Sequence, residues 1–319
     1  MEALVAGMYG KTEHVKVTGP LGEPVICEYG IIESTKTAVI EMAGAAGITQ
    51  VPDEKRNPLY TTTYGVGEVI KDAIEKGCRR FIVGIGGSAT NDGGVGMLQA
   101  LGYAFLDKDG KQVLPGARGL KDITEITAAY VIPELAECKF RVACDVTNPL
   151  CGELGCSSIY GPQKGATPEM IQDMDQWLGA YAELAKERFP KANPKYPGTG
   201  AAGGMGFAFL TFTDAVLESG INIVPDETKL EDYIKDADLV ITGEGRMDGQ
   251  TAMGKAPVGV AKLAKKYGKK VIAFAGAVQR DARACNDAGI DAFFPILRGV
   301  VTMEEAMKYE NAKQNLADT

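Results

Sequence analysis

Residues 79–94, RRFIVGIGGSATNDGG, indicate the fold class because they join a buried strand directly to a glycine-rich loop. The apolar run predicts a strand over 79–83 that stops abruptly. Five glycines follow, and between them stand four small polar residues, Ser88, Thr90, Asn91 and Asp92. Glycine allows a tight turn and a close approach by a ligand. The stretch therefore indicates either a capped surface turn or a site for an oxygen-rich group such as phosphate.

Composition and charge restrict the kinds of protein this can be. The 319 residues are enough for two domains, and the net charge of -8 without a basic stretch argues against nucleic acid or an anionic membrane as partner. No run of about 18 apolar residues occurs, so no membrane span is expected. Seven cysteines without a C-x-x-C pair indicate reduced thiols and a cytoplasmic protein.

The single histidine limits the chemistry. His14 lies in a polar segment near the start, so a His-rich zinc site is excluded and a Ser-His-Asp triad would depend on this one residue. Proton transfer is then expected from Asp, Glu, Lys or Tyr side chains.

The order of predicted elements indicates an α/β chain with two domains. The first part contains β-rich runs typical of antiparallel strands, and the last third alternates strand and helix, as in a parallel sheet with crossover helices. We place the boundary near Pro225, which gives a mixed-sheet domain over 1–224 and a second domain over 225–319. Further elements predicted are a hairpin over 102–114 and helices over 61–77, 168–189 and 207–220.

Loop one, residues 84–94, permits two functional interpretations. Gly84, Gly86 and Ala89 form G-x-G-x-x-A after a strand, and Asp107 follows about 20 residues on, as in dinucleotide-binding proteins. A nicotinamide-dependent oxidoreductase is therefore one alternative. However, Asp92 would repel a pyrophosphate unless a cation lay between them, and a carboxylate with phosphate and Mg²⁺ is typical of phosphoryl transfer.

Loop two, residues 144–166, begins where another apolar strand ends. Asp145 comes directly after this strand and Asn148 follows it closely, at a place where α/β sheets bind ligands. Lys164 adds one cation in the stiff turn G-P-Q-K-G. The alternative is an Asx turn with a solvated lysine. We interpret the cysteines of this loop as buried or free thiols, because their spacing does not suit a metal.

Loop three, residues 197–206, is PGTGAAGGMG and leads into a helix. It repeats the G-x-G-x-x-G spacing, but a polar, proline-rich segment precedes it where the dinucleotide motif needs a strand. Gly203 and Gly204 could contribute bare backbone N–H groups to an anion cradle. A tight packing turn is the equal alternative.

Loop four, residues 241–257, combines carboxylates and cations after a buried strand. Glu244, Arg246 and Asp248 alternate, and Gly249 to Lys255 spells G-x-x-x-x-G-K. Ala256 stands where a P-loop has the Ser or Thr that binds Mg²⁺, so the motif match is weak. A charged, solvated loop is the alternative.

Four long segments, GIGGSATNDGG, CDVTNPLCG…YGPQKGA, PGTGAAGGMG and DLVITGEGRMDGQTAMGKAPVGVA, together resemble the bacterial type I glycerate kinase family. The resemblance spans nearly the whole chain. It implies phosphorylation of D-glycerate with ATP and Mg²⁺, with 2-phosphoglycerate the favoured product. It also implies a Rossmann-like domain, split between the chain ends, and an inserted mixed-sheet domain likened to a restriction-endonuclease core.

The resemblance leaves one part of the family pattern unmatched. Family members carry a few dozen residues upstream, including a D-S-F-K-G-S segment, and this sequence begins after them. A chain that lacks them would have an exposed edge in its Rossmann-like sheet. A truncated and inactive remnant of a glycerate kinase is therefore the third alternative, beside the kinase and the oxidoreductase.

Chemistry and resemblance together assign expected roles to the residues of the four loops. We expect a small-molecule enzyme that binds D-glycerate and nucleotide. The expected catalytic residues are Asp92, Asp145, Lys164, Arg246 and Lys255. The expected substrate- and ATP-binding residues are Gly86, Gly87, Ser88, Thr90, Asn91, Asn148, Gly203, Gly204, Glu244 and Thr251. The expected Mg²⁺ ligands are Asp92, Asp145, Glu244 and Asp248.

Overall fold

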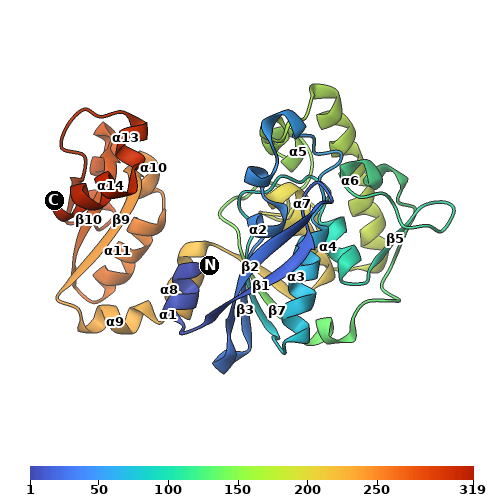
Figure 1. The fold of residues 1–319 in the computed structure, drawn as a ribbon, viewed down its shortest axis with the longest axis horizontal. Coiled ribbons are helices and arrows are strands. Elements are labelled where there is room, and N and C mark those ends of the chain that lie inside the picture. Colours follow the sequence, from blue (N-terminus) through green and yellow to red (C-terminus); the bar gives the residue numbers. More distant parts are fainter. The chain divides into compact units, whose positions relative to one another are not determined.

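A computed structural model describes residues 1–319, and it divides the chain into two compact units (Figure 1). The first unit is Met1–Ser219 and the second is Gly220–Thr319. Pro225, where we placed the domain boundary, lies inside helix α8 (Gly220–Glu227) of the second unit.

The first unit contains a mixed six-stranded sheet in the order β1-β2-β3-β4-β7-β8. The antiparallel start predicted from the sequence is confirmed, because β2 pairs antiparallel with both β1 and β3. The other neighbouring strands pair in parallel. The strands are β1 (Lys11–Thr18), β2 (Pro24–Ile32), β3 (Thr37–Glu41), β4 (Arg80–Gly84), β7 (Lys139–Ala143) and β8 (Ala215–Glu218).

Helices cover this sheet and carry the loops of interest. Phe81 of β4 stacks on Phe140 of β7, with ring centroids 4.7 Å apart, and Phe209 packs against Phe140 at 5.5 Å. These buried rings fix helix α7 over the strands that precede loops one and two. The helices are α1 (Glu2–Gly7), α2 (Ala43–Ala46), α3 (Tyr64–Glu75), α4 (Val95–Ala100), α5 (Cys156–Tyr160), α6 (Pro168–Arg188) and α7 (Ala201–Phe212).

Helix α6 shows how local sequence fixes an element. Thr167 caps its N-terminus, and its side chain accepts a hydrogen bond from the backbone N–H of Met170. Pro168 occupies the first turn, where its missing N–H removes no hydrogen bond. The predicted helix over 168–189 is confirmed.

Two predicted elements differ in the structure. The helix predicted over 207–220 ends at Phe212, and Ala215–Glu218 forms strand β8 beside β7. A short apolar run of this kind is compatible with either a helix or a strand. Residues 215–218 form a strand because they can pair with the free edge of β7. The hairpin predicted over 102–114 turns as expected, since the Asp107 N–H donates to the Lys111 carbonyl. However, strand β5 (Ala104–Leu106) takes its ladder partner from the later strand β6 (Glu125–Thr127).

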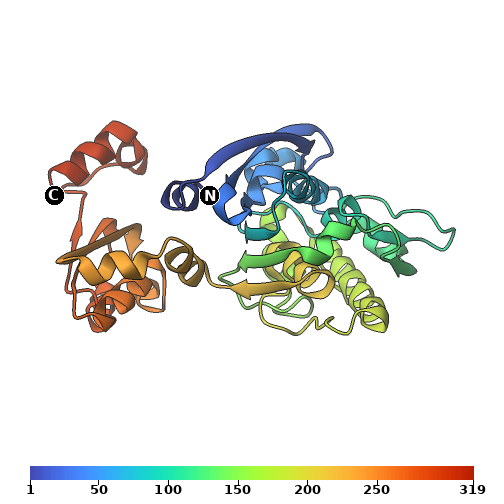
Figure 2. The ribbon, with the colours of Figure 1, turned by 90° about the horizontal axis from the view of Figure 1, so that it is seen from below.

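The second unit contains a three-stranded parallel sheet in the order β11-β10-β9. Helices alternate with these strands along the chain, which confirms the predicted alternation, and Figure 2 shows strands and helices of this unit in orange. Its strands are β9 (Leu239–Met247), β10 (Lys270–Val278) and β11 (Ala292–Pro295). Its helices after α8 are α9 (Leu230–Asp236), α10 (Gly249–Ala252), α11 (Ala256–Lys266), α12 (Ala284–Asp287), α13 (Met303–Met307) and α14 (Tyr309–Ala317). The predicted α/β class is thus confirmed for both units.

None of these helices combines the length and the apolar character that crossing a membrane requires.

Candidate active site

Loops one, two and three of the first unit meet around a cavity of about 440 Å³. Loop one follows β4 and loop two follows β7, and these strands are parallel neighbours. Because parallel neighbours end at the same edge of a sheet, the two loops emerge side by side. The sequence-predicted residues that line this cavity are Gly86, Gly87, Ser88, Asp145 and Lys164.

Lys164 supplies a buried cation to the cavity. It is 2% exposed, and its Nζ donates hydrogen bonds to Ser88 Oγ (2.8 Å) and to the Thr90 carbonyl oxygen (2.6 Å). Burial lowers the pKa of Lys164 to about 8, although Cys156 and Asp92 act in the opposite direction. An ammonium group has three donors, so one N–H is left without an acceptor in the chain. The solvated lysine of the alternative interpretation is thereby excluded.

Loop one lines the same cavity with three residues whose backbone N–H groups are unpaired. The N–H groups of Gly86, Gly87 and Ser88 have no hydrogen-bond acceptor within the chain. Gly87 has φ +73°, and no atom lies within 4 Å of the place where Gly86 would carry a Cβ. Both glycines are exposed. This part of the loop is therefore open to a ligand.

Asp145 supplies the carboxylate of the cavity. It follows β7 directly, its side chain is exposed, and the Ser219 hydroxyl donates a 2.6 Å hydrogen bond to its Oδ1. A cation and a carboxylate thus line one cavity, from opposite ends of loop two.

Asp92 belongs to loop one but does not line the cavity. It is buried, and its carboxylate accepts hydrogen bonds from the Thr63 N–H (2.8 Å), the Thr63 hydroxyl (2.9 Å) and the N–H groups of Gly94 and Gly96. Burial raises the pKa of Asp92, while these hydrogen bonds act in the opposite direction. Because its carboxylate is fully occupied by donors within the protein, Asp92 connects loop one to the N-terminal ends of α3 and α4.

Neighbouring polar residues also hold loops in place. Asn91 is buried and donates to Ser157 Oγ at 2.8 Å. Asn148 donates to the Leu154 carbonyl at 2.9 Å and accepts from the Tyr160 hydroxyl at 2.7 Å. Neither asparagine lines the cavity. The ligand contacts expected for Asn91 and Asn148 stay predictions.

The nicotinamide alternative lacks its structural context. Helix α4 begins only at Val95, and the Asp92 carboxylate already accepts the N–H groups at its start. A dinucleotide fold needs that helix N-terminus for pyrophosphate. Asp107, the candidate ribose ligand, accepts the N–H groups of Asp109 and Lys111 in a turn of its own.

Loop three packs tightly against loop one. A Cβ on Gly203 would lie 2.1 Å from the Thr90 carbonyl oxygen, and one on Gly204 would lie 2.7 Å from Gly93 Cα. The Gly93 N–H donates to the Gly203 carbonyl at 2.9 Å. The packing interpretation therefore describes these two glycines better than the anion cradle does, because backbone atoms of loop one lie where a side chain would begin.

Loop four gathers its charged residues within the second unit. Asp248 caps α10 by accepting the N–H groups of Gln250 and Thr251, and Thr251 donates to Glu244. Arg246 lies 3.1 Å and Lys255 3.6 Å from the Asp248 carboxylate. Burial alone would raise the pKa of Asp248, but Arg246 and Lys255 hold it below its usual range. The alternative interpretation of loop four, a charged and solvated loop, therefore does not describe it well, because its charged side chains contact one another in an ordered cluster. The first four residues of its G-x-x-x-x-G-K segment form the short helix α10, so the segment does not have the loop structure of a P-loop motif.

The predicted Mg²⁺ ligands divide between the two units. Asp92 and Asp145 belong to the first unit and Glu244 and Asp248 to the second. The chain brings no three His, Cys, Asp or Glu side chains together in a metal-binding arrangement. Metal ligation by these carboxylates therefore stays a prediction.

Several residues that line the cavity of the first unit were not among the predicted site residues, and Tyr160 and Ile48 illustrate two different reasons. Tyr160 stands four residues before Lys164 in Y-G-P-Q-K-G, and its closeness to the predicted cation could have indicated it. Ile48 carries no such signal. It reaches the cavity because Gly47 forms a β-bridge with Ser88, a contact between distant parts of the chain.

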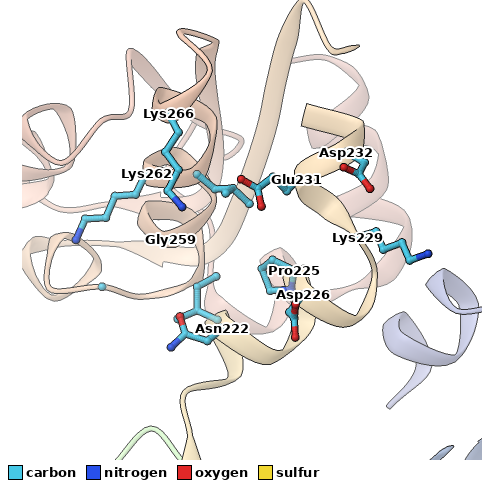
Figure 3. Close-up of a pocket in the computed structure, with 12 residues that line it drawn as sticks. Asn222, Pro225, Asp226, Lys229, Glu231, Asp232, Gly259, Lys262 and Lys266 are labelled. Atoms are coloured by element: carbon cyan, nitrogen blue, oxygen red, sulfur yellow. The ribbon is translucent and has the colours of Figure 1, made fainter. Parts of the chain in front are cut away.

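A second cavity, of about 550 Å³, lies within the second unit between α8, α9 and α11 (Figure 3). Lys262 and Lys266 extend from α11, and Glu231 extends from α9. Both lysines are exposed, and Glu231 accepts a hydrogen bond from Tyr267. None of the residues expected to be catalytic or to bind substrate, ATP or Mg²⁺ lines this cavity.

Comparison with known proteins gives a consistent result over the whole chain. The model of the glycerate kinase family matches residues 1–319. The chain is 50% identical to the glycerate kinase of Haemophilus influenzae, covering 100% of this chain and 84% of that protein. It is 48% identical to the glycerate 2-kinase of Escherichia coli, covering 100% and 85% respectively. A crystal structure of glycerate kinase 2 from Salmonella typhimurium superposes with a TM-score of 0.89 at 47% identity, covering 99% of this chain and 82% of that one.

Proposed function

The chain belongs to the glycerate kinase family, and we propose that it transfers the terminal phosphoryl group of ATP to D-glycerate. The observation that carries this proposal is that Lys164 and Asp145 line one cavity. A small hydroxy acid can place its carboxylate at the ammonium group and a hydroxyl at the Asp145 carboxylate. Most of the remaining lining is small or apolar, which favours a small ligand.

Asp145 is the general base in this proposal. The glycerate hydroxyl oxygen bonds to the terminal phosphorus, and its proton passes to Asp145. The bond between that phosphorus and the bridging oxygen breaks, and its electron pair leaves with ADP. Lys164 holds the acid, so that the reacting hydroxyl is positioned and its attack becomes effectively unimolecular.

Loop four is the proposed place for the phosphates and Mg²⁺. Arg246 and Lys255 carry positive charge that suits nucleotide phosphates, and Glu244 and Asp248 are hard oxygen ligands that suit Mg²⁺ together with phosphate oxygens. The ion would neutralise charge on the transferring group. Asp92 has a positioning role here, because its carboxylate is already committed to backbone donors.

The favoured product is 2-phosphoglycerate. Support comes from the relative named glycerate 2-kinase, which matches this chain along its full length. The position of the phosphate can be read directly from the ³¹P and ¹H spectra of the product.

The test is ADP release by the full chain with ATP, Mg²⁺ and D-glycerate, with L-lactate and acid-free controls. Asp145→Asn removes the proton acceptor and should lower kcat by about 10²–10⁴. Asp109→Asn, in an exposed turn, is the matched control and should leave kcat unchanged. ADP release that does not depend on D-glycerate would contradict the proposed function.

A further inference from the structure

Lys164 is a buried cation without an anionic partner. No carboxylate lies within ion-pair distance of its Nζ, and its two hydrogen bonds go to the neutral acceptors Ser88 Oγ and Thr90 O. A buried charge is unfavourable unless it is paired, so such an arrangement favours a bound anion. The titratable groups near the ammonium are Asp92, Cys156, Tyr160 and Asp145.

Further donor groups belong to residues that line the same cavity. Ser88 Oγ accepts from Lys164, so its own O–H is left to donate to a ligand. The backbone N–H groups of Gly86, Gly87 and Ser88 have no acceptor in the chain, and Gly87 has a left-handed φ of +73°. Successive free N–H groups in such a turn form an anion-binding concavity.

Apolar side chains strengthen these donors. Ile48 and Ile85 line the cavity beside the glycines. Interactions between charges are stronger where apolar walls exclude water. Every donor in this set belongs to the first unit, so nothing in the set depends on the nucleotide or on loop four.

We propose that Lys164, the Ser88 hydroxyl and the backbone N–H groups of residues 86–88 form an oxyanion subsite that is occupied without nucleotide or Mg²⁺. Its ligand is the carboxylate of the acid substrate or a free phosphate ion. This inference rests on the proposed function only for the identity of the acid. One consequence is that the acid binds the free enzyme. A second is that inorganic phosphate competes with the acid.

The test is calorimetric titration of the full chain with D-glycerate and, separately, with inorganic phosphate, both without nucleotide or Mg²⁺. Lys164→Met removes the ammonium group and should weaken anion binding at least about tenfold, since hydrogen bonds to charged groups are stronger than those between neutral groups. Ser88→Ala keeps the cation and removes one donor, and it should weaken binding several-fold. Lys121→Met, on an exposed lysine, is the control.

The outcomes separate this inference from the proposed function. Binding that is weakened in both variants supports the subsite, and the anion that binds identifies its ligand as carboxylate, phosphate or both. Wild-type affinity in Lys164→Met, or no binding of either anion to the wild-type chain, overturns it. Since a disrupted fold would also abolish binding, the thermal transition of each variant is compared with that of Lys121→Met. If the chain turns over D-glycerate but binds neither anion in the absence of nucleotide, only the proposed subsite is contradicted. If it binds an anion but shows no turnover, only the proposed kinase activity is contradicted.

Discussion

The Nζ atom of Lys164 lies 2.6 Å from the carbonyl oxygen of Thr90, a residue 74 positions earlier in the chain. This hydrogen bond joins loop two to loop one, and both loops line the cavity. It places the only buried lysine of the chain beside the free N–H groups of the glycine-rich loop.

The affinity for the acid should fall as the pH rises through about 8. Burial lowers the pKa of Lys164 to about 8, so above that pH the unliganded enzyme loses the positive charge that binds the anion. The KM for D-glycerate, measured between pH 7 and 9.5, should therefore increase in the upper half of this range. Lys164→Met should have a high KM at every pH without this inflection. A wild-type KM that stays flat would contradict the assignment.

The same pKa makes a prediction about stability. The folded-state pKa of Lys164 lies below its ordinary value of 10.5, so the unfolded chain binds more protons between about pH 8 and 10.5. The contribution of this group to the free energy of unfolding should therefore rise with pH across that window. Denaturant unfolding of wild type and Lys164→Met measures it. The difference between the two proteins should change with pH in this window and be constant below it.

Asp92→Asn should destabilise the first unit. The amide that replaces the carboxylate turns an NH₂ group toward donors at Thr63, Gly94 or Gly96 and leaves at least one of them unpaired. A buried unpaired group costs about 1–3 kcal/mol, which urea unfolding should detect. Asp109→Asn is the control. A variant as stable as the wild type would show that Asp92 does not hold loop one.

Gly203→Ala should be more destabilising than Gly110→Ala. Both positions have a left-handed φ, +68° and +73°, so both substitutions introduce similar backbone strain. Only at Gly203 does the new Cβ meet backbone, 2.1 Å from the Thr90 carbonyl oxygen, whereas nothing lies within 4 Å at Gly110. The clash should add about 1–3 kcal/mol, measured as the difference between the two variants in urea. Equal losses would contradict the close packing of loops one and three.

Arg246→Met and Lys255→Met test the proposed nucleotide role of loop four. Each removes a cation near Asp248, and each should raise the KM for ATP at least several-fold while changing the KM for D-glycerate little. Lys266→Met is the matched control, because this exposed lysine of the same unit lines the second cavity. An effect of Lys266→Met on the KM for ATP as large as that of Arg246→Met would move the nucleotide to that cavity.

Elements whose pattern is strictly local could be predicted well. The strand 79–83, the helix 168–189 and the strand–helix alternation of the last third each carry their own periodicity and caps. The sequence could not show that the helix predicted over 207–220 ends at Phe212. The last part of this run forms strand β8 because it pairs with the free edge of β7, which lies far away in the sequence. Asp145 and Lys164 are recognisable as candidates because one directly follows an apolar strand and the other is a cation in the turn G-P-Q-K-G. Ile48 reaches the site only through the β-bridge between its neighbour Gly47 and Ser88.

The sequence by itself determined the α/β class, the four glycine-rich loops and the residue types available for chemistry, because these depend on local periodicity and on side-chain identity. The tertiary structure decided which of those residues share a site. It buried Asp92 among backbone donors, packed Gly203 and Gly204 against loop one, and brought Lys164 to Ser88. The physical reason is that desolvation and hydrogen-bond partners come from distant segments. A carboxylate or a lysine therefore acquires its role from the residues that fold against it.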